Sequence, residues 1–107
     1  MDIRRKAQRN IRKEFLRFKR ELFLRHTKED IWEACEKIHF YTCMREYFQL
    51  NEKIPRVYLE LAQAERGLIG MAWDEYLKEE QLRYQTWPEL EELLEAVLLK
   101  WRLPRAA

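Results

Sequence analysis

Turn-forming residues are scarce in this chain, and their scarcity constrains the fold more than any other feature of the sequence. Only two glycines and three prolines occur among 107 residues. Sheets built from many short strands need tight turns, which draw mainly on these residue types. Hydrophobic residues make up 47% of the chain and aromatics 13%, a mixture that excludes a disordered or low-complexity chain. The sequence therefore predicts a single all-α domain over residues 1–107.

Apolar residues recur at helical intervals along most of the chain. The first stripe has steps of three or four residues and consists of Ile3, Ala7, Ile11, Phe15, Phe18 and Leu22. Helices are predicted over residues 2–25, 28–50, 55–66 and 68–84, and over a fifth segment that follows Thr86. Thr86 opens a Thr-x-x-Glu capping box, with Pro88 in the first turn of this last helix. The pattern predicts a compact bundle of about five helices.

Three further residues or segments are expected to mark helix ends. Thr27 is a predicted N-cap for the helix over residues 28–50, and Gly67 is a predicted C-terminal stop for the helix over residues 55–66. Residues 103–107 are expected to form a frayed tail after the last helix.

Charge is divided unevenly between the first helix and the remainder. Residues 1–26 hold ten Lys and Arg against three acidic residues, a net charge of +7, whereas residues 27–107 have a net charge of −5. A basic amphipathic helix over residues 1–26 is thus joined to an acidic helical body over residues 27–103. The predicted binding residues are the cations opposite the apolar stripe and two apolar residues among them: Arg5, Arg9, Arg12, Lys13, Leu16, Lys19, Arg20 and Phe23.

The alternative to a binding surface is that these cations are only solvated, or that they pair with the chain's own acidic helices. Leu16 and Phe23 would be core residues instead if a second helix crossed there.

Cysteine usage and the N-terminus point to the cytoplasm. Cys35 and Cys43 are eight residues apart in one predicted helix, about 12 Å along its axis, too far for a disulfide. The basic start is followed by no apolar signal segment, and no run approaches the 18 apolar residues of a membrane span. A mitochondrial transit peptide is the alternative, because residues 1–26 are Arg-rich and acid-poor, but the usual serines are absent.

Constellations typical of enzymes are missing from the sequence. Cys35, His39 and Cys43 are metal-ligating types, but ligands about 12 Å apart on one helix cannot share a zinc ion. Glu36-x-x-His39 resembles half of a di-iron motif and lacks the second half. The chain contains no serine, and its two glycines cannot form a phosphate loop. We therefore expect no enzymatic activity, no catalytic or metal-binding residues and no cofactor.

Residues 27–100 resemble a group of small helical proteins of unknown function from bacterial chromosomes and mobile elements. Three segments carry the resemblance: Lys28-Glu29-Asp30-Ile31, Trp73-Asp74-Glu75-Tyr76-Leu77-Lys78 and the helix Trp87–Val97. The resemblance implies an all-α fold and a bacterial or phage origin, and it implies no site residues.

These observations favour a non-enzymatic protein that binds another macromolecule. The expected partner is a protein or nucleoprotein, and in a mobile element the chain would inhibit or modulate a host protein such as a defence nuclease. The alternative is direct nucleic-acid binding, with the cations of the first helix on phosphates. The many aromatic residues are also typical of a homo-oligomer or of a partner groove.

Overall fold

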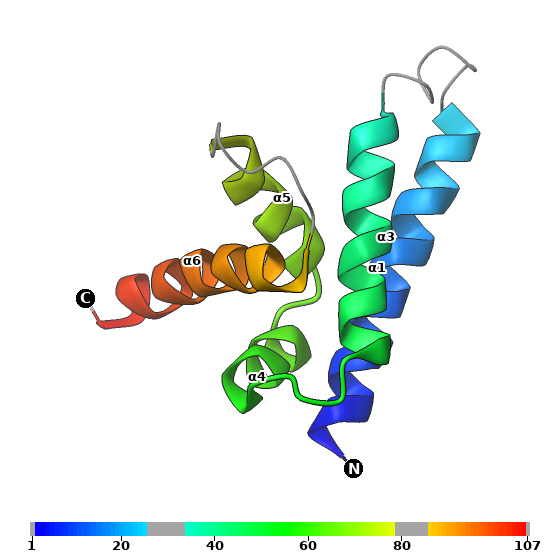
Figure 1. Ribbon diagram of the computed structural model, residues 1–107. Helices are drawn as coiled ribbons and strands as arrows, with labels where there is room; N and C mark the ends of the chain where they lie inside the picture. The colour runs from blue at the N-terminus through cyan, green and yellow to red at the C-terminus, as the bar shows by residue number, and fades with distance from the viewer. Residues whose placement is uncertain (1, 26–33, 79–85, 107) are drawn as a thin grey trace.

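Helices make up nearly all of the regular structure. The structure, a computed structural model, describes residues 2–25, 34–78 and 86–106 (Figure 1). These residues form helices and no strand: α1 (Ile3–Arg25), α3 (Cys35–Leu50), α4 (Arg56–Ala64), α5 (Leu68–Lys78) and α6 (Trp87–Ala106). The predicted all-α bundle of about five helices is confirmed.

The two long helices α1 and α3 lie side by side and antiparallel (Figure 1). The short helix α4 packs against α1, and α5 packs against α6. Further contacts join α5 to both α1 and α3, and α4 to α6. Because α1 contacts three other helices, it is part of the bundle and does not project from it.

The core forms where these helices meet. Its fully buried side chains include Ile11 from α1, Phe40 and Tyr47 from α3, Leu61 from α4 and Leu94 from α6. Every residue of the predicted α1 stripe is buried or half-buried. The exposed side of α1 is therefore the side that carries most of its cations.

The predicted helix over residues 28–50 is confirmed for residues 35–50 and wrong at Ala34, and its residues 28–33 lie outside the described residues. Helix α3 begins at Cys35, after Ala34, whose φ of −86° and ψ of 7° place it outside the helix. No glycine, proline or asparagine stands next to Ala34, so no local residue type signals that α3 begins only after it. Thr27, the predicted N-cap, lies outside the described residues, as do residues 79–84 of the predicted fourth helix.

Two predicted helix ends also differ from the structure. Helix α4 ends at Ala64, because Glu65 adopts an extended backbone while its N–H still bonds to the Leu61 carbonyl at 2.9 Å. Gly67 has no positive φ and is not the C-terminal stop. The expected frayed tail is helical, since α6 continues to Ala106. Pro104 has no N–H and removes one backbone hydrogen bond from this last turn, yet the helical backbone continues to Ala106.

Candidate binding surface on the first helix

The predicted binding residues all lie on the solvent side of α1. We call this set the basic face; each of its members is exposed: Arg5, Arg9, Arg12, Lys13, Leu16, Lys19, Arg20 and Phe23. Leu16 is 52% exposed and Phe23 62% exposed, so neither belongs to the core. Among the described residues, no second helix covers these two side chains.

Exposed apolar side chains gather at the C-terminal end of this face. Leu24 is 77% exposed and follows Phe23 directly. Apolar groups of this size among cations are typical of surfaces that contact another macromolecule, because they offer both desolvation and charge.

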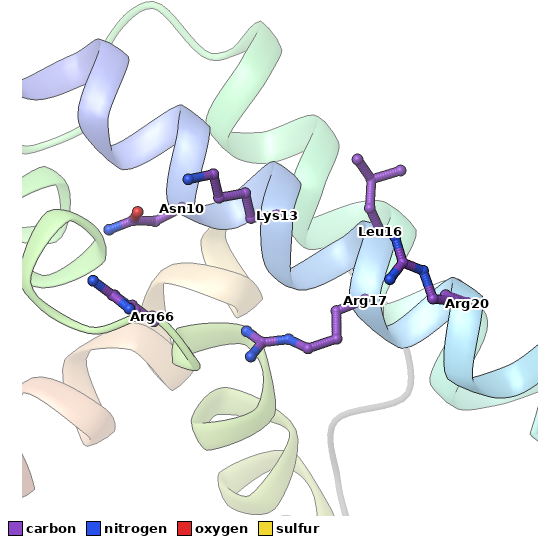
Figure 2. Close-up of a pocket in the computed structure, with 6 residues that line it drawn as sticks. All are labelled: Asn10, Lys13, Leu16, Arg17, Arg20 and Arg66. Atoms are coloured by element: carbon purple, nitrogen blue, oxygen red, sulfur yellow. The ribbon is translucent and has the colours of Figure 1, made fainter.

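A groove runs between α1 and the connection from α4 to α5 (Figure 2). We call it the cationic groove; it has a volume of about 460 Å³ and is lined by Asn10, Lys13, Leu16, Arg17, Arg20 and Arg66. In Figure 2, Arg17 extends from α1 toward the connection that carries Arg66. The groove contains three predicted residues, Lys13, Leu16 and Arg20, and adds three that the sequence analysis did not single out.

A second, smaller hollow lies on the α3 side of α1. Its volume is about 300 Å³, and it is lined by Arg5, Gln8, Arg9, Arg12 and Gln49. The basic face is thus divided between two hollows, and Lys19 and Phe23 line neither of them.

Most cations of this surface pair with no carboxylate in the parts of the chain that the structure describes. Across residues 2–25, 34–78 and 86–106, no hydrogen bond or ion pair joins a carboxylate to these side chains: Arg5, Arg12, Lys13, Lys19, Arg20 and Arg66. Within these three ranges, the intramolecular pairing considered as an alternative above therefore does not neutralise them. Their mutual repulsion favours binding of an anionic group.

The connection that carries Arg66 is fixed to α1 at both of its ends. On the α4 side, the Asn10 amide donates hydrogen bonds to the carbonyls of Ala62 at 3.0 Å and Gln63 at 2.9 Å. On the α5 side, the Glu14 carboxylate accepts hydrogen bonds from the backbone N–H groups of Ile69 at 2.7 Å and Gly70 at 2.8 Å.

A third contact fixes the same connection to α6. The Trp101 indole N–H donates to the Glu65 carboxylate at 2.5 Å. Arg66 therefore projects from a short segment that is held by hydrogen bonds to two different helices.

Glu14 is the buried acidic residue of α1, only 7% exposed. Desolvation raises the pKa of its carboxyl above the usual 4.5, while the hydrogen bonds from Gly70 and Ile69 and the charge of Arg17 act in the opposite direction. Its position explains the start of α5, because a carboxylate at a helix N-terminus satisfies N–H groups that lack a partner within the helix.

Two acidic residues of α6 accept hydrogen bonds from tyrosines. Tyr47 donates to Glu91 at 2.6 Å, and Tyr58 donates to Glu95 at 3.2 Å. Burial, with the hydrogen bond to Glu91, raises the pKa of Tyr47. Burial and the Glu95 carboxylate raise the pKa of Tyr58 to about 12. Both tyrosines therefore stay protonated as donors at neutral pH.

The cysteine and histidine residues of α3 form no larger cluster. The Cys43 sulfur lies 3.5 Å from His39 Nε2, and Cys35 is an exposed free cysteine. Within the part of the chain that the structure describes, no group of three or more His, Cys, Asp or Glu is placed to hold a metal ion.

Sequence reasoning missed Arg17, Arg66 and the anchors Asn10 and Glu14. Arg17 was counted in the charge of the first helix, but Arg66 and Asn10 carry no local signal, because their importance depends on how α4 packs against α1. Glu14 could have been found, since it lies three residues after Ile11 and four before Phe18 and is therefore in line with the apolar stripe.

Comparison of this chain with protein-family models, with curated proteins and with solved structures finds no significant match. Among the described residues, no helix combines the length and apolar character needed to cross a membrane.

Proposed function

We propose that the protein is a non-enzymatic binding protein that holds a protein or nucleoprotein partner through the basic face of α1. If the chain is encoded by a phage or another mobile element, as the resemblance of residues 27–100 implies, it acts as an inhibitor or modulator of a host protein such as a defence nuclease. Such a protein acts by occupying a surface and needs no catalytic residues of its own.

One observation carries this proposal: on one helix face, exposed apolar side chains are interleaved with cations that pair with no carboxylate in the described residues, namely Arg5, Arg12, Lys13, Lys19 and Arg20. Leu16 and Phe23 supply apolar area, and these cations supply charge that no carboxylate in the described parts of the chain neutralises. Interfaces between proteins combine these two elements, with apolar anchors at the centre and charge that guides association.

The test is a charge-reversal variant, Arg9→Glu with Arg12→Glu and Lys13→Glu. We expect it to remain folded, because all three side chains are exposed, and to lose the partners that the wild-type chain captures from a bacterial lysate. A matched control reverses three exposed cations elsewhere, Lys53→Glu with Arg56→Glu and Lys78→Glu, and should retain those partners. If the α1 variant folds and still captures every partner, the basic face is not the binding surface.

Direct nucleic-acid binding is the second candidate function, and the cationic groove favours it. Four cations line one groove, and no carboxylate lies among its lining residues. Fluorescence anisotropy with labelled DNA and RNA at several salt concentrations distinguishes the two candidates, since binding through phosphates weakens linearly in log[salt].

A further inference from the structure

We infer that the cationic groove binds the phosphodiester backbone of a nucleic acid, with Lys13, Arg17, Arg20 and Arg66 as the phosphate-binding side chains. This inference rests on the proposed function, because it names the chemical group that α1 holds in a nucleoprotein partner. It assigns a role to Arg17 and Arg66, which lie outside the basic face.

The charge of the groove is the first argument. Its six lining residues include four cations and no acidic residue. Three of these cations, Lys13, Arg20 and Arg66, make no hydrogen bond or ion pair with a carboxylate anywhere in the described parts of the chain. A concave surface of one charge concentrates anions more strongly than the same charges on a flat surface.

The fixed position of Arg66 is the second argument. Hydrogen bonds from Asn10 to the end of α4 and to Glu14 from the start of α5 hold the intervening residues against α1. Trp101 holds Glu65, the neighbour of Arg66, from the α6 side. Since the backbone of Arg66 is already ordered, bringing it to an anion shared with α1 requires little additional ordering.

The spacing of the cations is the third argument, and it favours a phosphate chain over separate carboxylates. Lys13 and Arg20 are about 10 Å apart along the axis of α1, whereas successive phosphates of one duplex strand rise by about 3.4 Å. A single strand therefore presents several anions along the groove. Guanidinium groups also bind phosphate oxygens in a bidentate manner, and the groove supplies three of them.

The test uses the full-length chain and removes one cation from each side of the groove, Lys13→Gln with Arg66→Gln. A matched control, Lys53→Gln with Arg56→Gln, removes the same charge from exposed positions outside the groove. Binding to labelled single-stranded DNA, single-stranded RNA and duplex DNA is measured by fluorescence anisotropy from about 50 to 200 mM salt, the range in which phosphate contacts show a clear salt dependence. Circular dichroism checks that each variant is folded.

We expect wild-type binding to weaken linearly in log[salt]. Loss of two phosphate contacts should reduce the salt slope by about 1.4 to 1.8 and weaken binding at 0.1 M salt by about 25- to 60-fold. The control should change binding by no more than about twofold, because charges outside the groove are largely screened at this salt. If Lys13→Gln with Arg66→Gln does not fold, Arg20→Gln with Arg66→Gln makes the same test.

Three outcomes would overturn the inference: no nucleic-acid binding at 50 mM salt, equal losses in the groove variant and the control, or displacement of the nucleic acid by polyglutamate at equal charge concentration.

The proposed function is judged separately. If the charge-reversal variant loses its captured partner while the wild-type chain binds no nucleic acid, the proposed function stands and this inference fails. If nucleic-acid binding depends on the groove but partner capture survives charge reversal, this inference stands and the proposed function fails.

Discussion

Glu14 has a structural role that its charge alone does not indicate. Replacing it by glutamine keeps the size of the side chain, but an amide NH₂ cannot accept a hydrogen bond, so one of the N–H groups of Ile69 and Gly70 loses its partner. We expect Glu14→Gln to lower the free energy of unfolding at pH 7 by about 1–3 kcal/mol, measured by urea denaturation. The control Glu21→Gln alters an exposed residue of the same helix and should change stability little. Equal stability of the two variants would contradict this role.

The pH dependence of this contribution has a definite sign. Burial raises the pKa of Glu14 in the folded chain above its usual 4.5, so the folded state binds its proton more tightly than the unfolded state does. The contribution of Glu14 is therefore full below pH 4.5 and decreases as the pH rises through the raised pKa. The gap in stability between wild type and Glu14→Gln should narrow over that interval. A gap that widens with rising pH would mean that the hydrogen bonds outweigh burial.

At the scale of helices, α5 begins in close contact with α1 and α3. A Cβ atom at Gly70 would lie 3.3 Å from the Tyr41 hydroxyl and 3.4 Å from the Glu14 carboxylate. Neither neighbour moves freely, because Tyr41 stacks on Phe18 with ring centroids 4.0 Å apart and Glu14 is held by two hydrogen bonds.

We therefore expect Gly70→Ala to destabilise the chain by about 1 kcal/mol, although alanine is the better helix former by a similar amount. Gly67→Ala is the matched control. Its Cβ would meet only the Glu14 carboxylate, at 4.0 Å, and Gly67 has no positive φ, so its stability should be unchanged or slightly higher. The midpoint of thermal unfolding of both variants tests this expectation. If Gly70→Ala is at least as stable as Gly67→Ala, Tyr41 and Glu14 move away from the added methyl group at little cost.

Helices were predictable from the sequence wherever a local pattern specifies them. The apolar stripe of α1 and the capping residues before Trp87 each lie within one segment, so their meaning does not depend on packing. The non-helical Ala34 has no glycine or proline beside it and was missed, and the end of α4 at Ala64 comes before Gly67, the residue predicted to end this helix. The basic face was also predictable, since helical periodicity alone separates it from the stripe. The groove was not, because it requires Arg66 to lie beside α1, and that depends on contacts between distant residues.

At the scale of the whole molecule, α1 contributes too much of the core to be an accessory arm. Ala7, Ile11 and Leu22 are buried, and Phe15 and Phe18 pack against the core. Burial of a large apolar side chain such as that of Ile11 or Leu22 contributes about 1.5–3 kcal/mol, and the half-buried rings of Phe15 and Phe18 add to this, so their combined loss is comparable to the total stability of a small domain. A chain limited to residues 27–107 should therefore show no cooperative thermal transition by circular dichroism. A cooperative transition with native helix content would mean that the remaining helices fold independently of α1.

The anchors on either side of Arg66 also restrict how this chain can vary in length. Loops between helices are ordinarily where insertions and deletions accumulate. Asn10 and Glu14 are one helical turn apart on α1, and they hold the end of α4 and the start of α5 respectively. An added or deleted residue between Ala64 and Leu68 would release one of these anchors and move Arg66 away from α1. In any descendant of this sequence that keeps the groove, we expect that spacing to be inherited unchanged.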